Sequence, residues 1–279
     1  MLTRILTSAI GLVVFFAVFF ANEMIFAAAI AVVSLAMVYE AVKAINAGRK
    51  TTVLSLILSA CAFGNWFLTK YSAVIIFPGS SWDFGLVNAV LWIAGGVFCY
   101  MLLSVREFGK VEFSKIYAAG FTTLYITLFM SFIILLRNYV GRYGVFAVFL
   151  FSWITDTGAY FTGSLIGKHK LEPELSPKKT VEGAVGGIVL TVIVSAVYMA
   201  VMKHFWNIDI HWLFLVASAI GAVLSEFGDL VASAMKRNLG VKDFGWIFPG
   251  HGGMLDRFDS VVFIAPYVYF VFVFLQIGH

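Results

Sequence analysis

The sequence predicts an all-α, polytopic integral membrane protein with about nine transmembrane helices and a cytoplasmic N-terminus. Of its 279 residues, 61% are hydrophobic and only 12% are charged, whereas soluble domains carry about 25% charged residues. The apolar residues come in runs of 17 to 24, the length with which an α-helix crosses about 30 Å of hydrocarbon. This composition argues against a soluble enzyme and excludes a disordered chain, a disulfide-rich secreted domain and an outer-membrane barrel.

Nine apolar runs are separated by charged or turn-forming residues, and each predicts one membrane span. In chain order the spans are 5–21, 24–42, 52–69, 84–104, 116–136, 144–166, 183–202, 212–235 and 260–277. A cleavable signal peptide is the alternative for the first run, although no clear small-x-small cleavage site follows it.

Lys and Arg residues are distributed unequally between the loops on the two sides of the membrane. When the loops are assigned to alternate sides, the side opposite the N-terminus receives only four of the 19 basic residues, Lys70, Arg137, Arg142 and Lys203. The side of the N-terminus receives Arg4; Lys43, Arg49 and Lys50; Arg106, Lys110 and Lys115; Lys168, Lys170, Lys178 and Lys179; and Lys236, Arg237, Lys242 and Arg257. The positive-inside rule therefore predicts a cytoplasmic N-terminus, in the inner (plasma) membrane of the cell. The same bias explains the net charge of +4, so no nucleic-acid partner is expected.

Four acidic residues lie inside predicted spans, where an ionised carboxylate is costly. Glu40 is near a cytoplasmic end, so we expect it to reach the membrane interface. Asp156, Glu226 and Asp229 lie deeper, and each should face a polar interior and have a partner. Because no basic residue lies in any span, the expected partner is a metal ion or a positive group from a loop or substrate.

Small residues accompany two of these acids on their helical faces. One face of the sixth span carries Ser152, Thr155, Asp156, Ala159 and Gly163, and one face of the eighth carries Ser218, Ala222, Ser225, Asp229 and Ser233. Such stripes are also ordinary packing seams between membrane helices. Both interpretations stay open for the small residues, whereas packing does not require the two carboxylates.

The densest group of polar residues lies just before the last span. It consists of Ser233, Lys236, Arg237, Lys242, Asp243, Pro249, Gly250, His251, Gly252, Gly253, Asp256, Arg257 and Asp259. Asp256 and Asp259 would share a helical face, and together with Asp229 they offer oxygen ligands suited to Mg²⁺. The glycines can expose backbone N–H groups to phosphate at a helix start, and the basic residues can neutralise its charge.

A third cluster follows the sixth span. Its members are Gly167, Lys168, His169, Lys170, Ser176, Pro177, Lys178, Lys179, Thr180, Val181, Glu182 and Gly183. Ser176 and Pro177 have the pattern of an N-cap and a first helical residue, so we expect the seventh helix to begin there, beside two lysines. This arrangement predicts a seat for a triphosphate. The alternative is a basic loop that binds anionic lipid headgroups.

These regions together resemble the phosphatidate cytidylyltransferases, also called CDP-diacylglycerol synthases. The family signature has the order S-x-x-K-R-x4-K-D, a Gly or small residue, an apolar residue, P-x-H-G-G and D-R-x-D, and residues 233–259 fill it without a gap. The resemblance extends upstream to residues 156–160, 167–170, 176–183 and 226–229. It covers residues 150–265 well and the first 140 residues only as generic membrane spans.

The resemblance implies that CTP and phosphatidic acid, a membrane lipid, form CDP-diacylglycerol and pyrophosphate, with Mg²⁺ required and a second cation as an option. It implies cation binding by Asp229, Asp256 and Asp259, with Asp156 and Glu226 completing or orienting the metal site. Lys236, Arg237, Lys242 and Arg257 would hold phosphates, and His251 would orient one. The expected substrate contacts come from Lys168, Ser176, Lys178, Lys179, Thr180, Ser233, Asp243, Gly252 and Gly253.

Two other functions stay open. A CTP-dependent polyprenol or phytol kinase would also need mid-membrane acids, basic loops and a lipid acceptor. A secondary transporter would also place acids on Gly-interrupted helices, but it leaves the loop signature unexplained. We expect residues 1–140, with spans one to five, to be a scaffold and residues 141–279 to be the catalytic region with cytoplasmic motif loops. A homodimer is one option for the assembly.

Overall fold

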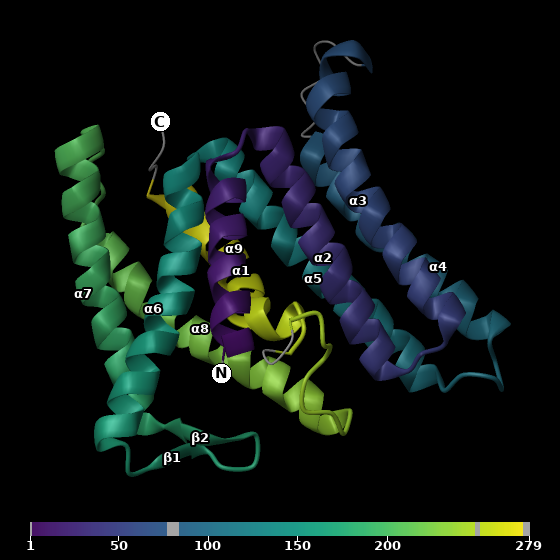
Figure 1. The fold of residues 1–279 in the computed structure, drawn as a ribbon. Helices are drawn as coiled ribbons and strands as arrows, with labels where there is room; N and C mark the ends of the chain where they lie inside the picture. Colours follow the sequence, from purple (N-terminus) through teal and green to yellow (C-terminus); the bar gives the residue numbers. More distant parts are fainter. Residues whose placement is uncertain (1, 77–83, 249–251, 276–279) are drawn as a thin grey trace.

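The computed structural model describes residues 2–76, 84–248 and 252–275, and this part of the chain is almost wholly helical. Its helices are α1 (Leu2–Phe20), α2 (Glu23–Ile45), α3 (Arg49–Ile76), α4 (Phe84–Arg106), α5 (Phe113–Tyr139), α6 (Arg142–Ile166), α7 (Val181–Trp206), α8 (Leu213–Asn238) and α9 (Leu255–Phe274) (Figure 1). Each predicted span overlaps one of these helices, and the last two residues of the span 260–277 lie outside the described part of the chain. The all-α class is therefore confirmed.

Several helices are suited to a membrane. Within the described residues, six are long and apolar enough to cross one, namely α2, α5, α6, α7, α8 and α9. A membrane protein with several spans is thus supported, while nine spans and a cytoplasmic N-terminus stay predictions. The start of α1 and the end of α8 lie toward the lower end of the bundle in Figure 1, and α9 ends toward the upper end.

The segment between α6 and α7 departs from the prediction, because it forms a short antiparallel hairpin. Strand β1 (Lys170–Glu172) pairs with β2 (Ser176–Thr180). Helix α7 begins only after Thr180, whose Oγ1 accepts a hydrogen bond from the N–H of Gly183 at 3.1 Å. The prediction of Ser176 as the N-cap was wrong, because strand pairing keeps residues 176–180 extended and Thr180 is also a suitable cap.

Helices α6 and α7 pack closely through small residues. Thr155 and Thr191 share a hydrogen bond between their hydroxyl groups at 2.8 Å, and an added Cβ at Gly158 would lie 3.0 Å from the Cα of Gly187. A Cβ at Gly163 would in turn lie 2.9 Å from Thr180 Oγ1. The packing interpretation therefore holds for the small residues of this seam. Asp156 does not belong to it, because its side chain is exposed.

Gly187→Ala should destabilise the bundle by about 1–3 kcal/mol, the usual cost of overpacking a tight contact. The added Cβ would lie 2.7 Å from the backbone carbonyl oxygen of Thr155, so α6 and α7 would have to separate. Thermal unfolding in detergent or nanodiscs measures the effect. Gly95→Ala on α4 is the matched control, since no atom lies within 4 Å of its added Cβ. Equal melting temperatures for the two variants would contradict the close packing of α6 against α7 at Gly187.

Helices α8 and α9 pack against each other and bring the polar motif together. Gly228 lies against Phe263 and Ser260, where a Cβ would come within 2.7 Å of the phenylalanine side chain. Helix α9 begins at Leu255, five residues before the predicted span. As a result, Asp256 and Asp259 both lie in its first turns and not in the preceding loop.

Candidate active site

The first cluster of charged side chains is centred on Lys179, at the end of the hairpin. Its Nζ lies 2.5 Å from Glu226 Oε2 and 2.8 Å from Asp229 Oδ2. The two acids are three residues apart on α8, so their carboxylates face the same side. The side chains of Lys179 and Glu226 are only 18% and 8% exposed. Of the partners that the sequence left open, a loop lysine is therefore the one that contacts the buried Glu226 and the half-buried Asp229.

The environment of Lys179 keeps its ammonium group charged. Burial disfavours the charged form, but attraction to Asp229 and Glu226 and hydrogen bonds with both outweigh burial and raise the pKa of Lys179. A raised pKa means that this contribution to stability is complete at neutral pH. It is lost only when the pH rises through the raised pKa in strongly alkaline solution.

Two further acids face this ion pair from other helices. Asp156 of α6 and Asp259 of α9 are close enough to Asp229 that the three carboxylates repel one another, while Lys179 attracts Asp156. Acids from α6, α8 and α9 are therefore neighbours, with Lys179 beside Asp156 and Lys236 beside Asp259.

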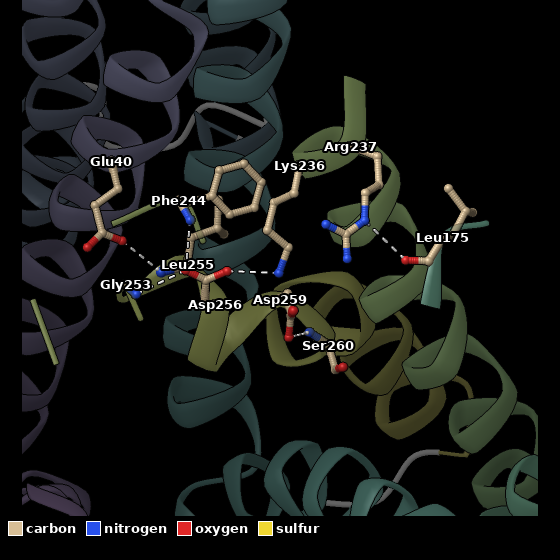
Figure 2. A network of polar contacts seen from close by, with 10 residues as sticks. All are labelled: Glu40, Leu175, Lys236, Arg237, Phe244, Gly253, Leu255, Asp256, Asp259 and Ser260. Atoms are coloured by element: carbon tan, nitrogen blue, oxygen red, sulfur yellow. Dashed lines mark hydrogen bonds and ion pairs between the residues drawn. The ribbon is translucent and has the colours of Figure 1, made fainter. Parts of the chain in front are cut away.

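The second cluster is centred on Asp256, whose side chain is 3% exposed. Its Oδ1 accepts a hydrogen bond from Lys236 Nζ at 2.8 Å, and its Oδ2 accepts the N–H groups of Phe244 at 2.9 Å and Gly253 at 3.0 Å (Figure 2). Asp256, in the first turn of α9, therefore contacts the end of α8 through Lys236 and the residues between the two helices through Phe244 and Gly253. Gly252 in this segment has φ +86°, a conformation that favours glycine.

The other predicted site residues lie around these two clusters. Arg237 Nε donates a long hydrogen bond of 3.5 Å to the carbonyl oxygen of Leu175, so it reaches the hairpin (Figure 2). Ser176 and Ser233 are half-buried, and the exposed members are Lys168, Lys178, Lys242, Asp243 and Arg257. The prediction for His251 concerns a residue outside the described part of the chain.

The region predicted to bind a triphosphate, residues 167–183, includes the carboxylate of Glu182. Glu182 at the start of α7 accepts the backbone N–H groups of Lys168 at 3.1 Å and His169 at 3.2 Å, and its Oε1 lies 2.6 Å from His169 Nδ1. These amides are therefore engaged by the protein itself. The basic side chains of the hairpin are the groups left to attract a phosphate.

The acids fit a divalent cation by their chemistry, because carboxylate oxygens are the ligands that Mg²⁺ prefers. Three of them repel one another, and the buried Glu226 Oε1 has no hydrogen-bond partner among the described residues. In the same part of the chain no three His, Cys, Asp or Glu side chains are gathered as a metal site would need. Lys179 supplies the positive charge there, and the metal ligands stay a prediction.

The sequence did not indicate the contacts that Glu40 makes. This residue was expected to reach the membrane interface, but it is buried at 3% exposure. Its Oε2 accepts the backbone N–H of Leu255, the first residue of α9, at 3.1 Å (Figure 2). An acid inside an apolar span was the available signal, but nothing in the sequence pointed to a partner 215 residues away.

The apolar helices support a membrane protein, and two clusters of acidic and basic side chains lie within its helical bundle. The chain belongs to the cytidylyltransferase family, whose family model matches residues 2–275. This match confirms the resemblance that the motifs predicted.

Curated relatives with the name phosphatidate cytidylyltransferase share large parts of the chain. The relative from Staphylococcus saprophyticus is 45% identical over 169 residues, which are 60% of this chain and 64% of the relative. The relative from Thermotoga maritima is 36% identical over 190 residues, 67% of this chain and 69% of the relative. The chain therefore spans about two thirds of the length of the relatives it matches.

Proposed function

We propose that this protein transfers a cytidylyl group from CTP to phosphatidic acid, producing CDP-diacylglycerol and pyrophosphate in phospholipid biosynthesis. The observation that carries the proposal is the meeting of basic and acidic side chains from the hairpin, α6, α8 and α9 at one end of an apolar bundle. Membership in the cytidylyltransferase family and the names of the relatives support it.

The reaction forms one bond and breaks one bond, and its main physical difficulty is the repulsion between two anionic reactants. A phosphate oxygen of phosphatidic acid forms a bond to the α-phosphorus of CTP, and the bond from that phosphorus to the oxygen of the β-phosphate breaks. Because both reactants are anions, neutralising their charge and aligning them in line matter most. The protein has little covalent chemistry to perform.

The basic residues at the end of α8 and in the following segment are proposed to hold the phosphates. Lys236 and Arg237 lie on the last turn of α8, and Lys242 and Arg257 are exposed. Lys179, Lys178 and the exposed Lys168 would approach the nucleotide from the hairpin side. Arginine adds geometric specificity, since its planar guanidinium can bind phosphate through two hydrogen bonds.

A divalent cation, proposed as Mg²⁺, would be held by Asp229 and Asp259 with Asp156 and Glu226. Asp256 remains among the proposed cation ligands. A carboxylate has about four acceptor positions, and protein donors fill three of those on Asp256, which leaves one for a cation. Such an ion supplies charge that stabilises the attacking and leaving oxygens. We further propose that the site faces the cytoplasm from the inner membrane, where CTP is available.

The test uses purified protein in nanodiscs with phosphatidic acid and CTP labelled in the cytosine base. The proposal predicts label in the extracted lipid and one pyrophosphate released for each lipid labelled. Label that stays in CDP would indicate a lipid kinase and would reject the proposal. Diacylglycerol in place of phosphatidic acid is the control, because it lacks the phosphate that attacks CTP and should acquire no label.

A further inference from the structure

Glu40 connects the N-terminal helices to the motif segment. The residue belongs to α2, yet its Oε2 accepts the N–H of Leu255 at 3.1 Å, and the backbone amides of Met254 and Ile247 also lie near its carboxylate. An anion is favourable at this place because the first N–H groups of a helix are unpaired and its N-terminus carries a partial positive charge.

Two motif glycines lie directly against this carboxylate. A Cβ added at Gly245 would lie 2.2 Å from Glu40 Oε1, and one added at Gly253 would lie 2.4 Å from Glu40 Oε2. Neither glycine has a positive φ, unlike Gly252. A side chain at either position would therefore displace the Glu40 carboxylate, whereas the backbone conformation there would accept other residues.

We propose that Glu40 is a positioning residue for the cytidylyl transfer, an inference that rests on the proposed function. It holds residues 244–248 and 252–255 and the first turn of α9 in the geometry in which Asp256 contacts Lys236 and Asp259 lies near Asp229. Glu40 acts on the site through the backbone, and it touches no reacting group itself. Residues 1–140 thereby help to position the site residues, and are not only a scaffold.

The charges around Glu40 favour this role. The neighbouring carboxylate of Asp256 repels Glu40, but Lys236 neutralises Asp256 at 2.8 Å. The backbone amides of the segment then provide the attraction that keeps the buried Glu40 in place. Hydrogen bonds that involve a charged group are stronger than neutral ones, so the loss of the carboxylate should loosen the whole segment.

The first measurement is a double-mutant cycle on the full-length protein in nanodiscs. Glu40→Ala should lower kcat about tenfold to a hundredfold, the effect of losing a charged hydrogen bond. Gly245→Ala should cause a similar loss, because its methyl group displaces the carboxylate. In the Glu40→Ala background, Gly245→Ala should cause no further loss, because the side chain it would displace is gone. Glu40→Gln, which keeps the volume and one acceptor oxygen, should recover part of the activity.

The second measurement, amide hydrogen exchange, does not depend on turnover. In Glu40→Ala and Gly245→Ala the amides of residues 244–248 and 252–255 should exchange faster, while those of α7 keep the wild-type rate. Ser34→Ala is the control, since Ser34 is also buried on α2 and its hydroxyl has no hydrogen-bond partner within the described residues. It should match wild type in both measurements.

The outcomes separate this inference from the proposed function. If wild type transfers no cytidylyl group, the proposed function fails, and unchanged exchange in both variants would overturn the positioning role by itself. Wild-type kcat in Glu40→Ala, or fully additive losses in the double variant, would also overturn it. Should Glu40→Ala fail to fold, Gly245→Ala and Glu40→Gln still test the inference, because they change only the contact and the charge.

Discussion

Asp256→Asn should reduce cytidylyl transfer by about a hundredfold to a thousandfold, the loss seen when a well-placed electrostatic group is removed from an active site. The asparagine oxygen can still accept the N–H groups of Phe244 and Gly253. Its amide nitrogen, however, would face the ammonium of Lys236, which then has no anion at 2.8 Å. Two donors that face each other cannot form a hydrogen bond, so Lys236 would leave the position from which it is proposed to hold a substrate phosphate.

The rate of base-labelled CTP incorporation into lipid measures this effect, with thermal unfolding recorded in parallel. The matched control is Asp209→Asn, which also removes an aspartate paired to a lysine, since Asp209 lies 3.2 Å from Lys203. That pair is exposed and lies at and just after the last turn of α7, whereas Lys179 precedes the start of that helix, so the control should keep normal activity. A near-normal rate for Asp256→Asn would remove Asp256 from the proposed machinery.

Lys179→Met should affect both activity and stability. Methionine has a similar length but no charge, so Glu226 and Asp229 would lose the ammonium group that lies within 2.8 Å of each. Breaking a buried ion pair by removing one partner costs about 3–5 kcal/mol. The rate should fall at least about a hundredfold, because the carboxylates that face the site would repel an anionic substrate. Lys203→Met on the exposed pair is the control.

Thermal unfolding of Lys179→Met with and without Mg²⁺ also tests the proposed cation site. An ion that binds only the folded protein stabilises it, and at a given concentration the stabilisation is larger when the ion binds more tightly. Mg²⁺ should therefore raise the melting temperature of the variant more than that of wild type, since the variant lacks the ammonium group that neutralises the acids. Equal shifts in the two proteins would argue that the carboxylates do not share a cation. Unchanged stability of the variant without Mg²⁺ would contradict the importance of the ion pair.

Much of the candidate site was predictable because its residues are close in sequence. Lys236, Asp256 and Asp259 lie within one motif, and helical spacing places Glu226 and Asp229 on one face of α8. The convergence of Asp156 with these acids was also predictable, because a carboxylate inside an apolar span needs a polar neighbour.

Other features could not be predicted, because they depend on which backbone groups meet. Ser176 and Thr180 are both acceptable N-caps, and the pairing of β1 with β2 decided between them. The hydrogen bonds from Phe244 and Gly253 to Asp256 involve backbone N–H groups, which every residue except proline carries.

The sequence by itself determined the helices, the family and the residues that carry charge into an apolar bundle. The reason is that hydrocarbon-length apolar runs and motif spacing are local properties of the chain. Only the tertiary structure decided the partners: Lys179 with Glu226, 47 residues apart, and Glu40 with Leu255, 215 residues apart. Those pairs form because helix packing brings distant segments together, and the order of residues along the chain does not encode such contacts in any local pattern.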